Sequence, residues 1–343
     1  MKKRSFLTMV LLGIIMSINA QITNPFFDHV NYIGAFDGTN NWTLGWANFD
    51  PDTVNYPTAT VTLTDSIYTN TTLNASTVYK LMGFVYVTQN ATLTIPAGTI
   101  IRGGDATASL IVEKGSKIIA QGTAANPIVF TSNNPAGSRA GGDWGGVVLC
   151  GEAINNLAGG SGTAEGGIRS TYGGNNNADS SGVMSYVRIE YAGYALQPNK
   201  EINGLTFYSV GNKTKIDHIQ VSMANDDSYE WFGGAVNAKY LIAFRGLDDD
   251  FDTDNGYSGN VQFGVVLRDP NVADISQSNG FESDNDASGS TSSPKTSAIF
   301  SNISVFGPLV NVSDVVNTNY RRAMHIRRNS ALSIYNSFFA GYP

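Results

Sequence analysis

The sequence predicts an all-β protein, built as a right-handed parallel β-helix with a cap at its N-terminal end. Short apolar runs recur between clusters of Gly, Asn, Ser, Thr and Asp, a pattern typical of many short strands separated by turns. After the first 20 residues, no apolar run with helical spacing exceeds two turns. From Tyr79 onward the runs align on one another, which indicates stacked coils of a solenoid.

Residues 1–20 are predicted to be a signal peptide that is removed before Gln21. A basic start, Met1-Lys2-Lys3-Arg4, precedes an apolar run that is too short to span a bilayer. Ala20 supplies the small residue that a signal peptidase requires. We therefore expect an extracellular protein, or one on the outer cell surface, that has no transmembrane segment and is a monomer.

The charge of the chain argues against a nucleic-acid partner. The formal net charge is -7 at pH 7, with 28 acidic against 21 basic residues. A protein that binds phosphate backbones carries the opposite charge. An acidic surface favours divalent cations instead, although many secreted proteins are acidic for solubility alone.

Residues 21–78 differ from the rest because aromatic side chains are spread among polar ones. We interpret this segment as an N-terminal cap, since the open end of a solenoid exposes strand edges and core. The alternative is a sugar-binding platform formed by Trp42 and Trp46.

The β-helix itself is predicted to occupy residues 79–343. Its later coils alternate inward apolar with outward polar residues, as strands of a half-buried sheet do. Such runs cover residues 183–191, 216–221, 240–245, 261–266, 298–305 and 331–338. Residues 151–182 read as a long loop with no obvious chemistry. The chain stops at Pro343 within the pattern of a coil, so we expect the helix to be truncated there.

An acidic repeat runs through consecutive coils. The segments 226–230 and 248–252 share two aspartates, an aromatic residue and a carboxylate at a spacing of 22 residues, and residues 279–286 repeat the theme. This spacing is explained if 22 residues make up one coil of the helix. The aromatic side chains of these coils are then expected to stack inside the helix. Glu230, Asp252 and Glu282 are expected to point outward, one above another at about 4.8 Å, the separation of adjacent strands.

We call the column formed by Glu230, Asp252 and Glu282 the acidic ladder. A fourth step of this ladder is predicted at His325. Matching Ala323-Met324-His325 to Gly280-Phe281-Glu282 places the histidine above the glutamate. Arginines lie nearby, and Arg245 and Arg268 end strands of neighbouring coils. The candidate catalytic residues are Glu230, Asp252, Glu282, His325 and Arg245.

Stacked carboxylates repel one another, so a cation is expected to hold them together. Calcium accepts several carboxylate and carbonyl oxygens in loose geometry. The candidate ligands are Asp226, Asp227, Asp248, Asp249, Asp250, Asp252, Asp254, Glu282 and Asp284. The alternative is that these acids only cap turns and pair with the nearby arginines.

Several segments resemble the opening coils of bacterial, pectate-lyase-like β-helix proteins. They are Pro96-Ala97-Gly98-Thr99, Val112-Glu113-Lys114-Gly115, residues 120–128 and Gly142-Asp143-Trp144-Gly145-Gly146. Residues 32–36 and 41–46, with the acidic coils, are similar to a group of secreted Bacteroidetes proteins. Members of that group often carry a sorting domain for type IX secretion. The resemblance implies the fold over nearly the whole mature chain, but no particular activity.

Three functions are compatible with these features. The first is a secreted protein that binds calcium and an extracellular polysaccharide, with Tyr229, Trp231 and Tyr257 holding sugar. The second is a polysaccharide lyase or glycoside hydrolase that uses the same face. The third is a non-catalytic structural solenoid or adhesin. The Asn-Thr-Asp, Gly-His-Gly and Arg-Ile-Lys signatures of polygalacturonases are absent, and fold analogy alone does not choose between these functions.

Overall fold

The computed structural model describes residues 24–197 and 200–343 of the chain. The predicted signal peptide, residues 1–20, lies outside the described residues. The chain divides into two units, residues 1–31 and 32–343. In the first unit a turn is closed by a hydrogen bond of 3.2 Å from the backbone N–H of Phe27 to the carbonyl of Asn24.

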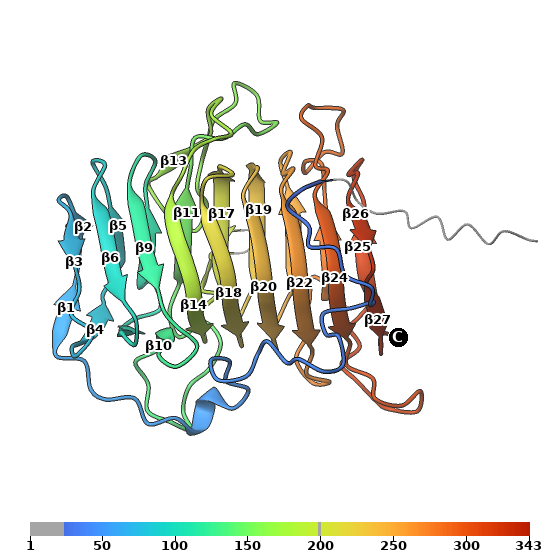
Figure 1. Ribbon diagram of the computed structural model, residues 1–343, viewed down its shortest axis with the longest axis horizontal. Coiled ribbons are helices and arrows are strands. Elements are labelled where there is room, and N and C mark those ends of the chain that lie inside the picture. The colour runs from blue at the N-terminus through green and yellow to red at the C-terminus, as the bar shows by residue number, and fades with distance from the viewer. Residues whose placement is uncertain (1–23, 198–199) are drawn as a thin grey trace, which may run out of the picture. The chain divides into compact units, whose positions relative to one another are not determined.

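The second unit is a right-handed parallel β-helix, which confirms the predicted fold class. A 14-stranded and a nine-stranded sheet run along it (Figure 1), and the strands of both pair in parallel. Apart from η1 (Pro51–Thr53), a single 3-10 turn, the described elements are all strands. None of the described residues form a helix of the length and apolarity that crossing a bilayer requires.

The strands of the two sheets follow one another around each coil. The 14-stranded sheet contains β1 (Val61–Leu63), β3 (Thr71–Thr72), β4 (Val78–Leu81), β6 (Thr92–Pro96), β7 (Ile100–Gly103), β9 (Lys117–Gln121), β10 (Ile128–Ser132), β14 (Gly182–Glu190), β18 (Lys215–Ser222), β20 (Asn237–Phe244), β22 (Asn260–Leu267), β24 (Ile299–Phe306), β26 (Ser333–Tyr335) and β27 (Phe338–Ala340). The nine-stranded sheet contains β2 (Ser66–Ile67), β5 (Phe84–Val87), β8 (Ser109–Val112), β11 (Gly146–Cys150), β17 (Leu205–Val210), β19 (Tyr229–Gly234), β21 (Phe251–Asp254), β23 (Asn279–Ser283) and β25 (Arg322–Ile326). Two hairpins, β12 (Gly162–Thr163) with β13 (Thr171–Tyr172) and β15 (Ala195–Gln197) with β16 (Lys200–Glu201), belong to loops.

The coils change shape along the chain at β14. The turn over residues 122–127 separates β9 from β10, and both strands pair with β14. The first pairing ends at Ser185 and the second begins at Val187, so the single residue Tyr186 replaces the whole turn. Tyr186 has φ 52°, the left-handed conformation that produces this sharp bend. Later coils therefore have one long, bent strand where the early coils have two.

The bend carries a column of aromatic rings on the outer side of the 14-stranded sheet. The rings of Tyr186, His218, Tyr240 and Phe263 stack with centroid separations of 4.2, 4.4 and 5.0 Å. Each of these residues has a positive φ. A left-handed residue other than glycine costs roughly 1–2 kcal/mol, and each ring pair offsets about 0.5–1.5 kcal/mol of that strain.

The interior of the coils is filled by a second column of aromatic side chains. Tyr229 and Phe251 stack at 5.6 Å, and Phe251 lies 5.1 Å from Phe281. All three side chains are completely buried. The predicted internal aromatic stack is therefore confirmed, and it fixes the rotation of the acidic coils because neighbouring residues must point outward.

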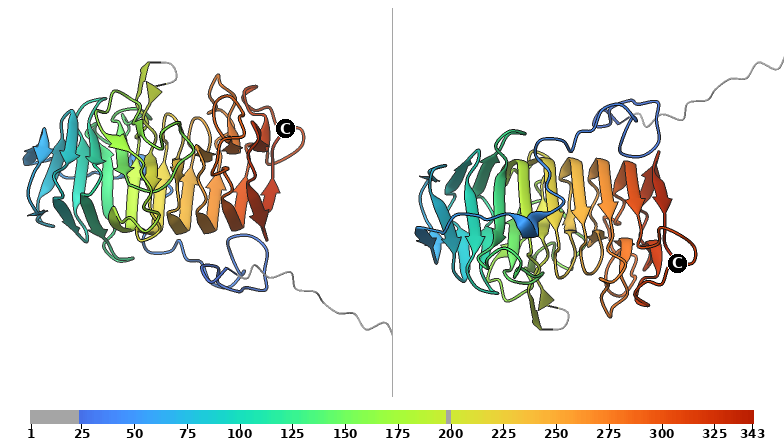
Figure 2. Two further views of the ribbon diagram at one scale, coloured as in Figure 1. Left: turned by 90° about the horizontal axis from the view of Figure 1, so that it is seen from above. Right: turned by 90° about the horizontal axis from the view of Figure 1, so that it is seen from below.

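Residues 32–58 of the segment predicted as a cap do not cover the first coil. Residues 32–58, which we call the strap, lie along the outer side of the 14-stranded sheet (Figures 1 and 2). One end of the strap is fixed by a hydrogen bond of 2.9 Å from the Ala35 N–H to Ser304 Oγ, and the other by one of 3.0 Å from Arg102 Nη1 to the Pro57 carbonyl. The helix also begins earlier than predicted, at β1. The physical reason is that the outer aromatic column is apolar and has to be covered.

Two buried arginines hold the last part of the strap. Arg102 directs its guanidinium at five backbone carbonyls, two of them in the strap, at 2.9–3.4 Å. Arg139 donates to the carbonyls of Pro51 and Val54 at 2.8 and 2.9 Å. These bonds satisfy donors that would otherwise be buried without partners.

Candidate functional site

The acidic ladder lies on the outer face of the nine-stranded sheet. Glu230 in β19 pairs with Asp252 in β21, Asp252 with Glu282 in β23, and Glu282 with His325 in β25. The register predicted from the 22-residue spacing is thus confirmed, including the step to His325. These residues point outward because their neighbours in the strands fill the interior.

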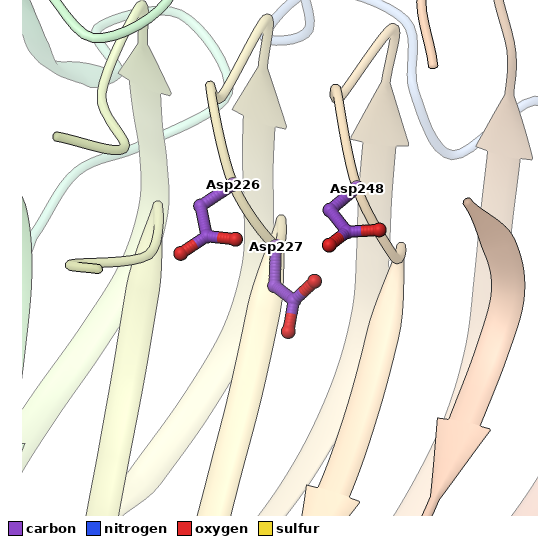
Figure 3. A group of neighbouring side chains, drawn as sticks. All are labelled: Asp226, Asp227 and Asp248. Carbon is purple, nitrogen blue, oxygen red and sulfur yellow. The ribbon is translucent and has the colours of Figure 1, made fainter. Parts of the chain in front are cut away.

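A first group of carboxylates gathers beside the turns that precede β19 and β21. One oxygen each from Asp226, Asp227 and Asp248 lies within 4.8 Å of the others. Figure 3 shows the three carboxylates together beside these two turns. Asp248 accepts a hydrogen bond of 2.6 Å from Ser276 Oγ, while its other oxygen is buried without a partner among the described residues.

A second group joins the first through Asp227. Oxygens of Asp227, Glu230 and Asp252 also lie within 4.8 Å of one another. Asp227 and Glu230 are 7% and 9% exposed. Glu230 Oε2 accepts a hydrogen bond from Asn203 Nδ2, whereas Asp252 Oδ1 is buried with no partner among the residues that the structure describes.

None of these carboxylates is in direct contact with a cationic side chain among the described residues, although the more distant charges of Arg327 and Arg268 act on Asp252 and Asp248. Within residues 24–197 and 200–343, no Arg, Lys or His forms an ion pair with any residue of the two groups. Burial raises the pKa of Asp227, Glu230 and Asp252 well above the ordinary value, and repulsion from neighbouring carboxylates raises each pKa further. These carboxylates therefore bind protons more readily than isolated carboxylates do.

The other end of the ladder is neutralised. Arg327 contacts Glu282 and donates to Asp284 at 3.0 Å, and Arg328 donates to Asp284 at 2.7 Å. His325 Nδ1 lies 3.5 Å from Glu282 Oε2. Burial raises the pKa of Glu282 to about 7, although Arg327 opposes this rise. The alternative in which acids pair with arginines thus describes Glu282 and Asp284, but not the two unpaired groups.

Two predicted calcium ligands have structural roles instead. Asp250 is completely buried and pairs with Arg268 at 3.1 Å. Asp249 is 4% exposed and accepts hydrogen bonds from the backbone and side chain of Asn279 in the next coil. Both aspartates precede β21 in a turn, where the side chains do not follow the alternation of a strand. The sequence repeat places them in the right coil but cannot show which partner each carboxylate takes.

Two further predicted residues lie apart from the unpaired groups. Asp254 pairs in register with Phe232, next to the ladder, and burial raises its pKa to about 7. Arg245, predicted to be catalytic, follows β20 in the other sheet and is exposed, with Nε 3.5 Å from Asp269 Oδ2. It does not join the ladder, because the strand that it ends belongs to a different side of the coil.

Glu165 belongs to the site but has no signal in the sequence. It comes from the loop over residues 151–182, which was expected to carry no chemistry. Tyr208 on the outer face donates a hydrogen bond of 3.3 Å to Glu165 Oε1. Burial raises the pKa of Glu165 to about 7, and the charge of Glu165 in turn helps to raise the pKa of Glu230. The loop has no repeat partner, so its fold over the sheet could not be predicted.

The aromatic residues proposed to hold sugar are not available. Tyr229, Trp231 and Tyr257 are completely buried inside the coils. The outer face carries a different aromatic group, in which Tyr208 stacks on Phe232 at 4.5 Å and lies at a tilt against Tyr172 at 4.7 Å. This group borders the acidic ladder, because Asp254 follows Phe232 in the same column of the sheet.

The sequence also matches one known family model. The model of a pectate-lyase-like β-helix domain matches residues 65–343, which begin just before β2 and cover the whole ladder. No curated protein and no solved structure matches the chain.

Proposed function

The chain belongs to the family of pectate-lyase-like β-helix domains, and from this premise we propose that it binds calcium and an extracellular polysaccharide. The acidic outer face of the nine-stranded sheet would be the binding surface. The observation that carries the proposal is the group formed by Asp227, Glu230 and Asp252, three largely buried carboxylates with no cationic partner among the described residues.

The spacing of the oxygens suits calcium. Calcium–oxygen distances of about 2.4 Å allow two ligands of one ion to lie up to about 4.8 Å apart. The oxygens of Asp227, Glu230 and Asp252 lie within that limit, as do those of Asp226, Asp227 and Asp248. The buried, unpartnered oxygens of Asp248 and Asp252 supply ligand atoms that make no other hydrogen bond. Calcium bound there would offset the repulsion among the carboxylates.

An acidic polysaccharide is the ligand that such a surface favours. A calcium ion that keeps an open coordination position can accept a carboxylate of the sugar chain. Arg327 and Arg328 at the neighbouring end of the ladder are 31% and 43% exposed in their side chains and neutralise Glu282 and Asp284, so this end would repel an acidic chain less than the unpaired groups do. The family name points to polysaccharides of this kind.

A pair of thermal melts tests the calcium proposal. Excess calcium should raise the midpoint relative to EDTA, since a cation that binds only the folded state stabilises it. Asp252→Asn should abolish this rise in the midpoint. The control is Glu113→Gln, which should preserve the rise because the carboxylate of Glu113 pairs with Arg169 elsewhere on the helix. If the melting midpoint of the unsubstituted protein is the same in calcium and in EDTA, the calcium site is rejected and a structural solenoid or adhesin is favoured.

Cleavage of the polysaccharide is a second candidate function. Glu282, Arg327 and His325 lie together and are partly exposed, which suits proton transfer beside a positive charge. In a lyase, a base removes the proton next to the sugar carboxylate, the bond to the leaving oxygen breaks and a double bond forms. In a hydrolase, water adds across the glycosidic bond instead. Incubation with polygalacturonate or alginate distinguishes them, because only a lyase produces ultraviolet-absorbing unsaturated ends.

Export is a separate part of the proposal. We propose cleavage before Gln21, as the leader-like residues 1–20 indicate. The resemblance to secreted Bacteroidetes proteins supports type IX secretion as the route. Expression in a Bacteroidetes host, followed by N-terminal sequencing of the protein in the medium, tests the cleavage position. Full-length protein retained in the cytoplasm would contradict it.

A further inference from the structure

A hollow of about 500 Å³ lies between the strap and the 14-stranded sheet, on a different sheet from the acidic ladder. Its lining includes Tyr32, Asp37, Asn40, Asn41, Trp42 and Tyr240. The volume falls within the roughly 300–1,000 Å³ of small-molecule sites, which combine aromatic walls with a few placed polar groups.

The aromatic walls of the hollow are held rigidly. Trp42 donates a hydrogen bond of 2.8 Å to the Ala35 carbonyl, and its ring stacks on Phe36 at 5.5 Å. Tyr240 lies 5.3 Å from Trp42 and is itself part of the stacked aromatic column. A ligand would therefore meet rings that lose little freedom on binding. The sugar platform proposed from the sequence is corrected in one respect, because Trp46 is only 1% exposed and cannot contact a ligand.

The polar rim is also pre-arranged. Asp37 accepts hydrogen bonds of 2.7 and 2.6 Å from the backbone N–H groups of Thr39 and Asn40, and one of 2.8 Å from Asn40 Nδ2. Asn41 Oδ1 accepts bonds from the backbone and hydroxyl of Thr43. Asn40 Oδ1 and Asn41 Nδ2 are left without hydrogen-bond partners among the described residues, one as an acceptor and the other as a donor.

We propose that this hollow binds a neutral saccharide unit. Aromatic rings accept the apolar face of a pyranose ring, and the free amide atoms suit its hydroxyl groups, which both donate and accept. Among the described residues that line the hollow there is no Lys, Arg or His, so none of them compensates an anionic ligand. The inference goes beyond the proposed function, since it involves another sheet and needs no calcium.

Titration with neutral oligosaccharides in EDTA tests the proposal, with cello-, xylo-, manno- and chito-oligosaccharides as probes and tryptophan fluorescence or calorimetry as the readout. We expect at least one of these probes to bind. Thr39→Trp should weaken binding at least tenfold by filling the hollow while keeping its backbone hydrogen bond. Asn41→Ala should weaken it by removing the free donor. Asn55→Ala, at an exposed position of the same strap, is the matched control and should leave affinity unchanged.

Two results would overturn the proposal. One is that none of the probes binds at millimolar concentration to the folded protein. The other is that binding survives Thr39→Trp although the melting curve of that variant shows an intact fold. Binding that instead requires calcium, or is lost in Asp252→Asn, would place the sugar on the acidic ladder and so separate this inference from the proposed function.

Discussion

Arg268 and Asp250 form an ion pair inside the coils, with 3.1 Å between Nη1 and Oδ1 and with both side chains completely excluded from solvent. Burial raises the pKa of Asp250 to about 7, and the guanidinium limits this rise. Burial lowers the pKa of Arg268, but the charge of Asp250 outweighs this effect and raises the pKa above its ordinary value. The pair lies where β22 ends and β21 begins, so it links two turns of the helix.

Removing one partner of this pair should destabilise the protein strongly. Arg268→Ala leaves Asp250 buried without its cation, and we expect a loss of about 3–5 kcal/mol in the free energy of unfolding. Arg245→Ala is the matched control, since the Arg245 side chain is 46% exposed in its ion pair with Asp269 and this pair should contribute less than about 1 kcal/mol. Urea denaturation measures both. Equal losses in the two variants would show that the buried pair has no special role.

Removing one charge of the unpaired acidic group should have the opposite effect. In EDTA at pH 8, Asp252→Asn should stabilise the protein, because it relieves repulsion from Asp227 and Glu230. Two unit charges about 4 Å apart repel by roughly 1 kcal/mol in water and about 4 kcal/mol near a protein surface. A lower melting point in EDTA for this variant would contradict the interpretation that the group is electrostatically strained.

The metal-free protein should become less stable as the pH rises from 5 to 8. Burial raises the pKa of Glu165, Asp254 and Glu282 to about 7 in the folded state, whereas the unfolded chain titrates near 4. Between these values the folded state binds more protons, so its stability falls as the pH increases. Melts in EDTA across this range measure the slope, and excess calcium should flatten it. A midpoint that rises with pH in EDTA would reject the raised pKa values.

Below about pH 4 the trend should reverse. Burial raises the pKa of Asp217, but hydrogen bonds from His218 and Ser185 outweigh it and lower the pKa to about 2. A carboxyl of this kind contributes stability above its unfolded pKa and loses it as the pH falls through 2. We therefore expect the melting point of the metal-free protein to be highest near pH 4, where the two trends meet. Asp217→Asn should reduce the loss on the acid side while leaving the slope above pH 5 unchanged.

Loss of the buried tryptophan of the strap should destabilise the whole helix. Trp46 is 1% exposed and packs edge-on against Tyr186 and His218 at 5.8 and 5.7 Å. Trp46→Ala should therefore lower the free energy of unfolding by about 3–5 kcal/mol. Leu44→Ala, 71% exposed in the same strap, should change it by less than about 0.5 kcal/mol. If both variants change the free energy of unfolding only slightly, the strap does not pack on the sheet in solution.

Much of the ladder was predictable because stacking converts sequence spacing into position. The 22-residue repeat places Glu230 beside Asp252, and matching of apolar neighbours extends the column to Glu282 and His325. A parallel sheet with filled interior positions permits only one register, since a slip by one residue would bury the carboxylates. The same logic predicted the internal stack of Tyr229 and Phe251.

The turn before β21 and the loop over residues 151–182 could not be predicted from repeat spacing. Asp250 and Asp252 differ by two positions, yet the first faces a buried arginine and the second an outer carboxylate group. A turn has no alternation that would distinguish them. Glu165 reaches the site from a loop without a repeat partner, and its placement depends on contacts such as the one with Tyr208.

The coil, the direction of its strands and the column of carboxylates all follow from the spacing of residues, because period and polarity are local properties that stacking repeats. The pairing of the acids, the course of the strap and the hollow beside Trp42 became visible only in the folded protein. These features join residues that are far apart in the chain, such as Ala35 and Ser304. Their positions follow from packing between non-repeating segments, which no spacing within the sequence encodes.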